Sequence, residues 1–176
     1  MHRIKVAVLG LLLASGAQAQ SDTSQKYRPA FKNLSGPEVV AVFISSTWCV
    51  GNRAPGLHEA IERAKLLLRE RARGDSKGFR AVGVALDWHP DSGRAYLREF
   101  GEFDELALGS NWFGLAPETY IWADTAARAA IPQFVVYERT VQPAGRRIAF
   151  QPRRVRIRVY GGPEIVEWAQ AGARIP

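Results

Sequence analysis

The sequence predicts an α/β domain in which a mixed central sheet, parallel in its core, carries helices on both faces and ends in an antiparallel hairpin. Two continuous apolar runs, residues 39–44 and 81–86, are typical of parallel strands covered on both faces. A segment with helical periodicity follows each run, and this alternation favours a parallel sheet core. Residues 154–160 alternate apolar and arginine side chains, which is the pattern of a half-buried antiparallel strand.

The amino terminus has the layout of a secretory signal peptide. A short basic start precedes an apolar run, and the small residues Ala17-Gln18-Ala19 follow it as a cleavage site. The run is shorter than the about 20 residues that a transmembrane span needs, which favours cleavage over retention as an anchor. We expect a signal peptide at residues 1–19, a polar lead-in segment at residues 20–37 and one domain at residues 38–176 of an exported protein, periplasmic or secreted.

The composition suits a single globular domain without internal disulfides. Hydrophobic residues make up 47% of the chain, enough to bury a core. The chain contains one cysteine, Cys49, so it cannot close a disulfide within itself. In an exported protein a lone thiol is a reactive centre, a site of intermolecular pairing or an inert buried residue.

The first apolar strand leads into an amphipathic helix. Within residues 53–73, Leu57, Ile61 and Leu68 recur at helical spacing while charged residues fill the other face. Gly74 is expected to end this helix, because glycine is the favoured residue just beyond a helix terminus.

The later elements follow from the same patterns. Residues 103–108 fit either a strand or a loop, and the alternating strand is broken by glycine and proline at residues 161–163. The remaining expectations are a helix at residues 92–100, a helical stretch at 115–122, a strand at 134–137 and a closing helix at 165–171.

Two short motifs stand at the ends of predicted strands. Trp48-Cys49-Val50-Gly51-Asn52-Arg53 lies between the first strand and its helix, and Ile131-Pro132 directly precedes the strand at 134–137. Together they resemble the thioredoxin family, which has a WCxxC motif at the first place and a cis-proline at the second. The long insertion after the second strand resembles periplasmic thioredoxin-like reductases of cytochrome maturation.

The resemblance implies a thioredoxin-like fold and a set of site residues. Cys49 would be the nucleophile, and the bond before Pro132 would be cis. The substrate groove would be formed by Trp48, Asn52, Arg53, Ile131 and Pro132. The implied partners are a thiol or disulfide substrate protein, or glutathione.

The sequence departs from the family pattern in ways that limit the chemistry. Asn52 stands where the resolving cysteine of the motif should be, so a dithiol cycle within one chain is excluded. The strand at residues 39–44 has no acidic residue and the strand at 81–86 has no lysine, so the family's buried proton-transfer pair is missing. If the chain is an enzyme, it is a monothiol relative of the thiol-disulfide oxidoreductases.

Cys49 is expected at the start of a helix, where free N–H groups and the helix dipole favour a thiolate. The dipole contributes about 0.3–1 kcal/mol, against about 1.4 kcal/mol per pKa unit, so strong activation needs Arg53 or another partner close by. An external thiol must then resolve any mixed disulfide. The alternative is a non-catalytic binding module for an extended peptide or a partner protein, in which Asn52 only caps the helix.

Auxiliary residues are expected at the end of the second strand. His89 and Trp88 follow it, so both should lie near Cys49 at the carboxyl edge of the sheet. His89 is either a general base for the thiol or a polar residue before a proline turn. His58 is expected to be solvated on the first helix. Histidines and cysteine are too few for a metal site, and neither a metal nor another cofactor is expected.

A run of arginines marks the predicted hairpin. It either makes a weak contact with an anionic surface or keeps an edge strand solvated. No nucleic-acid recognition motif accompanies it, so nucleic acid is not an expected partner. The residues concerned are Arg146, Arg147, Arg154, Arg156 and Arg158.

Overall fold

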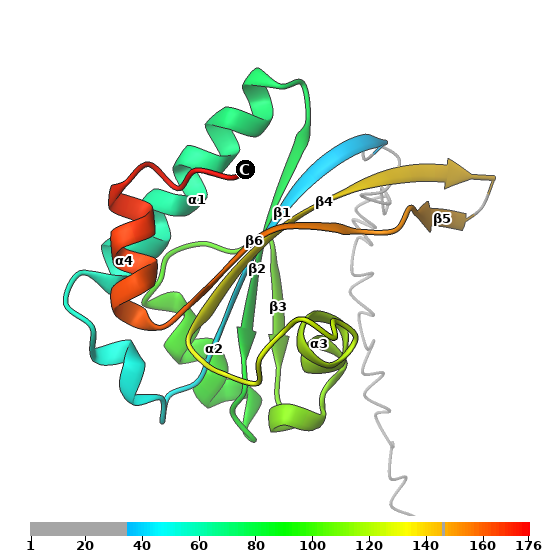
Figure 1. Cartoon of the computed structure of the whole chain (residues 1–176). Helices are drawn as coiled ribbons and strands as arrows, with labels where there is room; N and C mark the ends of the chain where they lie inside the picture. Colours follow the sequence, from blue (N-terminus) through cyan, green and yellow to red (C-terminus); the bar gives the residue numbers. More distant parts are fainter. Residues whose placement is uncertain (1–34, 146) are drawn as a thin grey trace, which may run out of the picture.

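Strand β1 (Gly36–Ser45) runs through the middle of a six-stranded sheet (Figure 1). The computed structural model describes residues 35–145 and 147–176, so the expected signal peptide lies outside the described residues. On one side, β2 (Gly78–Ala85) pairs parallel with β1, and β3 (Glu105–Leu108) pairs parallel with β2. On the other side, β4 (Gln133–Ala144) pairs antiparallel with β1.

The last two strands both pair with β4 and return along its free edge. β5 (Arg147–Phe150) pairs with the outer end of β4, and β6 (Arg154–Tyr160) pairs with its inner end. In Figure 1 the outer part of this hairpin extends away from the body of the sheet as an arm. The predicted antiparallel hairpin is confirmed: β6 has the predicted bounds, β4 extends well beyond the predicted strand at 134–137, and β5 was not predicted.

The three longer helices cover one face of the sheet. They are α1 (Leu57–Gly74), α2 (Pro90–Arg98) and α4 (Gly162–Gln170). The other face is covered by the insertion between β3 and β4, which has three short helical turns. These are η3 (Asn111–Phe113), α3 (Leu115–Pro117) and the π-helical turn η4 (Glu118–Trp122). Helices therefore lie on both faces, as predicted.

Side chains of β1 divide alternately between two apolar cores. Ala41 and Phe43 pack toward the long helices, with Leu97 and Ile165. Val42 and its neighbours on the same face pack under the insertion. This burial on both faces explains why the strand reads as a continuous apolar run, since each side of a central strand is removed from water.

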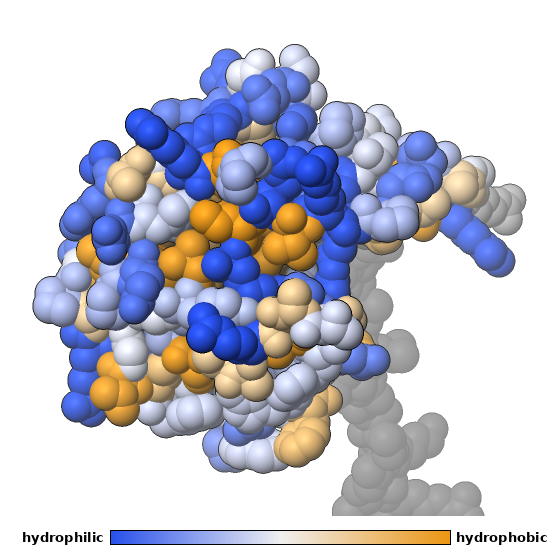
Figure 2. Space-filling view, viewed as in Figure 1, coloured by the Kyte–Doolittle hydropathy of each residue, from blue (hydrophilic) through white to orange (hydrophobic). Residues whose placement is uncertain are grey.

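The edge strand β6 follows the predicted alternation only in part, because its pairing with β4 is irregular between Val136 and Tyr137 and residues 156–160 are all partly buried. Ile157 and Val159 pack against the core on the long-helix face, whereas Val155 remains 39% exposed. The space-filling view looks onto this edge and shows apolar side chains gathered over it, with charged ones around them (Figure 2). Among the described residues, no helix is long and apolar enough to cross a membrane.

A βαβ unit, an antiparallel strand pair and a closing helix, assembled in this order on one sheet, make a thioredoxin-like fold. The predicted fold class is confirmed. The main difference concerns the first helix, which was expected from residue 53 and begins at Leu57. Residues 103–108, which fitted either strand or loop, contain the short strand β3.

Candidate functional site

The chain leaves β1 in a tight loop that places Cys49 at the carboxyl edge of the sheet. Ser45 and Ser46 are fully buried, whereas Thr47 and Trp48 are exposed in the turn. Cys49 follows in extended conformation, and its backbone N–H donates to the carbonyl of Ser46 at 3.2 Å. Its side chain is half-buried and free of any disulfide.

The two sequence motifs meet at the thiol. The Sγ of Cys49 donates to the backbone carbonyl of Ile131 at 3.2 Å, and the Ile131–Pro132 bond is cis. A Cβ on Gly51 would lie 2.5 Å from Cδ of Pro132, so the loop after Cys49 packs directly on the proline ring. The predicted cis bond is confirmed, as is the prediction that Pro132 lies beside the cysteine.

Asn52 braces the end of β1. Its Oδ1 accepts a hydrogen bond from Ser45 Oγ at 2.6 Å, and its Nδ2 donates to the carbonyl of Ser46 at 2.5 Å. The expectation that Asn52 caps the first helix is wrong, because the cap position of α1 is Gly56, with φ +78° and no side-chain hydrogen bond. The amide that replaces a second thiol is thus engaged at both ends.

Helix α1 starts too far from the thiol to act on it. Only the short 3-10 turn η2 (Val50–Arg53) follows Cys49, and Pro55 and Gly56 separate it from α1. The expectation that Cys49 sits at the start of this helix is therefore wrong, since a helix dipole acts only within about one turn of the terminus. Arg53 is exposed at the end of η2.

A groove of about 520 Å³ opens beside Cys49 on the side of α2. Its walls come from the loop after β1, from the first turn of α1 and from α2. The lining includes Trp48, Cys49, Arg53, His58, Tyr96 and Glu99. Three of the five predicted groove residues, Trp48, Asn52 and Arg53, line this side, whereas Ile131 and Pro132 lie on the other side of the thiol.

His58 is the histidine that the structure brings to this groove. Its ring stacks on Phe100, with centroids 4.4 Å apart and 23° between the planes. Its Nε2 lies 3.5 Å from a carboxylate oxygen of Glu99. The expectation that His58 is simply solvated is wrong. The helical pattern alone gave no signal for this position, because the stacking partner comes from the end of α2.

Two further residues at the thiol were missed by the sequence reasoning. Asp87 is buried just after β2 and accepts hydrogen bonds from Thr47, at 2.5 Å from Oγ1 and 3.3 Å from the backbone N. Tyr96 is 7% exposed at the floor of the groove. Asp87 bonds to the loop from the end of β2, and Asn52 bonds to it from within the loop. These two sets of hydrogen bonds together fix the position of Cys49.

His89 and Trp88 lie away from the thiol groove. His89 is exposed at the cap position of α2, before Pro90, and is not among the residues that line the groove. This agrees with a polar residue before a proline turn and not with a general base. Trp88 is 62% exposed and its ring lies 6.3 Å from that of Phe113, on the insertion side. Trp112, in the insertion, packs against Trp122.

Comparisons with known proteins give distant similarities of fold only. No known family model and no curated protein matches the sequence. A thiol:disulfide interchange protein of the thioredoxin family from Chlorobium tepidum TLS is 15% identical, with 78% of this chain and 81% of that chain covered and a TM-score of 0.36. BsSco, a member of the Sco family of cytochrome c oxidase assembly proteins, is 12% identical, with 77% and 80% covered and a TM-score of 0.33. Similarities this weak say nothing about the chemistry of this chain.

Buried charges lie elsewhere in the domain. Glu38 is 3% exposed at the start of β1, the opposite end from Cys49, and its Oε1 accepts from Arg139 Nε at 2.5 Å. Lys65 is buried on α1 and donates to the carbonyls of Phe100 and Glu102 at 2.6 and 2.8 Å. Neither group lines the thiol groove, in agreement with a missing proton-transfer pair beside the cysteine.

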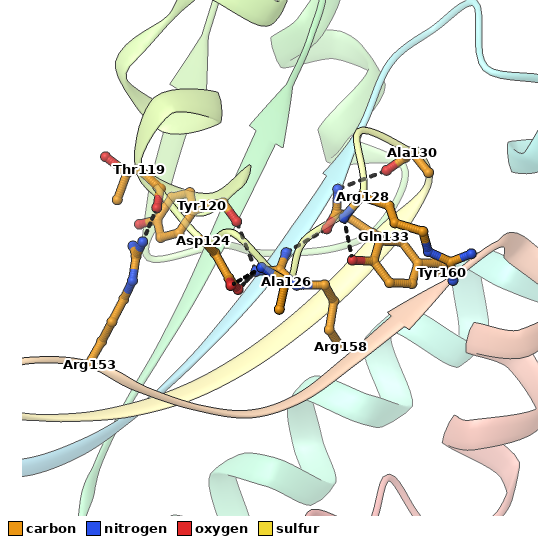
Figure 3. Close-up of polar contacts among 10 residues, drawn as sticks. All are labelled: Thr119, Tyr120, Asp124, Ala126, Arg128, Ala130, Gln133, Arg153, Arg158 and Tyr160. Carbon is orange, nitrogen blue, oxygen red and sulfur yellow. Dashed lines mark hydrogen bonds and ion pairs between the residues drawn. The ribbon is translucent and has the colours of Figure 1, made fainter. Parts of the chain in front are cut away.

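Several arginines of the hairpin are engaged within the fold. Figure 3 shows Arg158 pointing into the insertion, where it pairs with Asp124 at 2.7 Å and donates to Gln133 Oε1 at 2.6 Å. Arg153 donates to the carbonyl of Thr119, and Arg156 to that of Pro176. Arg158 is therefore a structural tie rather than a contact for an anionic surface. Arg147 and Arg154 are exposed, and Arg146 lies outside the described residues.

Within residues 35–145 and 147–176, no cluster of histidine, cysteine and acidic side chains could hold a metal ion. The chemistry available at the site is that of one thiol. Cys49 stands between a backbone carbonyl on one side and an open groove on the other.

Proposed function

We propose that this protein is an exported monothiol protein that exchanges or captures thiols through Cys49. The observation that carries the proposal is the setting of its sulfur, which is half-buried, bonded to the Ile131 carbonyl and open to a groove of about 520 Å³. The chain has no second cysteine, and Asn52 occupies the place of one. One sulfur with a route of approach and no resolving partner suits exchange with an external thiol.

The reaction takes place in two exchange steps. The Cys49 thiolate attacks one sulfur of an external disulfide, a mixed disulfide forms, and the second sulfur leaves as a thiolate that takes a proton from solvent. An external thiol, acting as its thiolate, then attacks the mixed disulfide and frees the Cys49 sulfur. The external thiol is the reductant, and the protein returns to its starting state.

The two sides of Cys49 have different parts in this scheme. The edge formed by Ile131 and Pro132 is backbone and apolar ring, which suits an extended peptide that carries the substrate disulfide. Trp48 is 53% exposed beside the thiol and supplies an aromatic contact. Asn52 holds the loop in shape, and Arg53 contributes a cation at the rim.

A trapping experiment tests this function. The purified mature protein is incubated with glutathione disulfide, and the intact mass is measured before and after excess glutathione. We expect one glutathione adduct that excess thiol removes, and none on a Cys49→Ser variant. If the native protein forms no adduct while the unfolded chain does, the monothiol proposal is wrong.

A binding module without catalysis is the second candidate. It is favoured by the exposure of Trp48 and Val50, which flank Cys49 with 53% and 73% of their surface open to solvent. Exposed apolar residues at a groove are a contact surface for a peptide. This function does not need the sulfur, so it predicts that Cys49→Ser retains peptide binding, measured by calorimetry, whereas Trp48→Ala loses it.

Export is part of the proposal and rests on the first nineteen residues. We expect protein isolated from the cell envelope to begin near Gln20, as seen by mass spectrometry of the intact chain. A mature chain that still carries Met1 would contradict cleavage.

A further inference from the structure

We infer that the groove on the α2 side of Cys49 binds the small external thiol or disulfide, a molecule that carries a carboxylate, and that the Tyr96 hydroxyl donates a hydrogen bond to the reacting sulfur. The inference rests on the proposed function and deepens it, since it names the ligand class and the donor. It separates two approaches to one sulfur: the Pro132 side for a protein substrate and the α2 side for the small thiol.

The resting contact of Cys49 cannot serve the reactive state. The Sγ donates its proton to the Ile131 carbonyl at 3.2 Å, and a carbonyl oxygen can only accept. A thiolate is itself an acceptor, so on ionisation this pair becomes two facing acceptors. The sulfur then needs a donor, and the groove is the side on which it is open.

Tyr96 supplies such a donor. Its side chain is only 7% exposed and lines the groove. Its hydroxyl has no hydrogen-bond partner among the described residues. Tyr96 and Cys49 line the same groove, and burial raises the pKa of Tyr96, so its hydroxyl keeps its proton and can act as a donor.

An unpartnered buried hydroxyl destabilises a folded protein, so such groups call for an explanation. The acceptor that the site offers is sulfur, either the Cys49 thiolate or the thiolate that leaves from a bound disulfide. In the exchange step the Cys49 sulfur forms its new bond, the bound disulfide breaks, and the Tyr96 hydroxyl donates to the charged sulfur without giving up its proton. The leaving thiolate takes its proton from water.

The size and charge of the groove indicate the ligand. A volume of about 520 Å³ falls in the range of small-molecule sites, about 300–1,000 Å³. The Glu99 carboxylate lies 3.5 Å from the Nε2 of His58. Arg53 remains at the rim as a cation, and guanidinium groups bind carboxylates through paired hydrogen bonds. A thiol with a carboxylate therefore fits better than a neutral or cationic one.

The test of the donor uses Tyr96→Phe, which keeps the ring and removes the unpartnered hydroxyl. We expect the melting temperature to stay the same or rise, because no hydrogen bond is lost. The second-order rate constant for reaction with glutathione disulfide should fall at least fivefold. A lower melting temperature with an unchanged rate would show that the hydroxyl is structural and would overturn its role.

The test of the ligand class compares three disulfides: glutathione disulfide (anionic), 2-hydroxyethyl disulfide (neutral) and cystamine (cationic). We expect the wild-type rates to fall in this order, and Arg53→Ala to reduce the preference for the anionic disulfide at least threefold. Arg98→Ala is the matched control, since it removes the same charge from α2 outside the groove lining. Equal rates for all three disulfides would overturn the inference and leave the proposed function standing, whereas no reaction with any of them would overturn the proposed function itself.

Discussion

Cys49 and Ile131 are 82 positions apart in the chain, yet the Sγ of the first donates to the backbone carbonyl of the second at 3.2 Å. The contact joins the loop after β1 to the residue before β4. It therefore ties the candidate nucleophile to two adjacent antiparallel strands. Four substitutions in the domain and one measurement on the thiol give testable outcomes.

Replacing Asn52 by alanine should destabilise the domain. The change leaves the Ser45 hydroxyl without its acceptor and removes one of the two donors to the Ser46 carbonyl, which keeps the Cys49 N–H, and both serines are fully buried. We expect the free energy of unfolding in urea to fall by about 1–3 kcal/mol. Arg53→Ala, at the next and exposed position, is the control and should change it by less than about 0.5 kcal/mol. Equal effects at the two positions would contradict the brace.

Glycine is required at the start of α4. A Cβ on Gly162 would overlap the carbonyl oxygen of Gly51 and lie 2.6 Å from Cβ of Ala54, so it would push away the loop that holds Cys49. Gly162→Ala should cost about 1–3 kcal/mol of unfolding free energy. Gly74→Ala, at the end of α1, meets nothing within 4 Å and should be neutral or stabilising by up to about 1 kcal/mol. If both variants unfold at the same urea concentration, the close approach is not real.

The ion pair between Asp124 and Arg158 should make stability depend on pH in acid. The hydrogen bond from Arg158 holds the pKa of Asp124 below its ordinary value. Stabilisation by a carboxyl of this kind is complete above its unfolded pKa of about 3.9 and is lost as the pH falls through the lower folded pKa. Asp124→Asn should therefore cost about 1–3 kcal/mol at pH 7 and progressively less below pH 4. Asp75→Asn, in a more exposed pair with Lys77, should change little at either pH.

Lys65 should also make stability rise with pH, but in base. Burial lowers its pKa to about 8, and Glu62, the next largest influence, opposes this only in part. Between pH 8 and 9.5 the unfolded chain binds more protons at this group than the folded protein, so stability should rise, by at most about 1.4 kcal/mol per pH unit. Above pH 9.5 the buried tyrosines Tyr96 and Tyr120, whose pKa values are raised by burial, make stability fall with pH and would obscure the rise. Lys65→Met should remove the rise, measured by urea unfolding at both pH values, and an amine that titrates near 10.5 by NMR would contradict the burial effect.

Most of the fold followed from the sequence because its strands are strongly patterned. The two parallel strands, the alternating edge strand and the closing helix were all predicted within a few residues. The start of the first helix was wrong because apolar spacing extends back past Pro55 and Gly56, whose φ of +78° ends any helix. The insertion was less well defined because its helical turns are too short to show a period.

The sequence predicted the site residues that belong to the two motifs, but not the residues that surround them. Cys49, Trp48 and Pro132 come together as the resemblance implied, since strand ends fix their places. No local pattern pointed to His58, because it enters the groove through stacking on Phe100, a tertiary contact between α1 and the turn after α2. The braces from Asn52 and Asp87, and the buried Tyr96, likewise depend on tertiary contacts.

The central claim is that the folded structure presents Cys49 as a working nucleophile. The measurement that tests it most directly is the rate of iodoacetamide alkylation of the single cysteine, in the native protein and in the same protein unfolded in urea at the same pH. The account predicts faster alkylation in the native state, because the groove is open and Tyr96 supplies a donor to the thiolate. Slower alkylation in the native state than in the unfolded chain would contradict it.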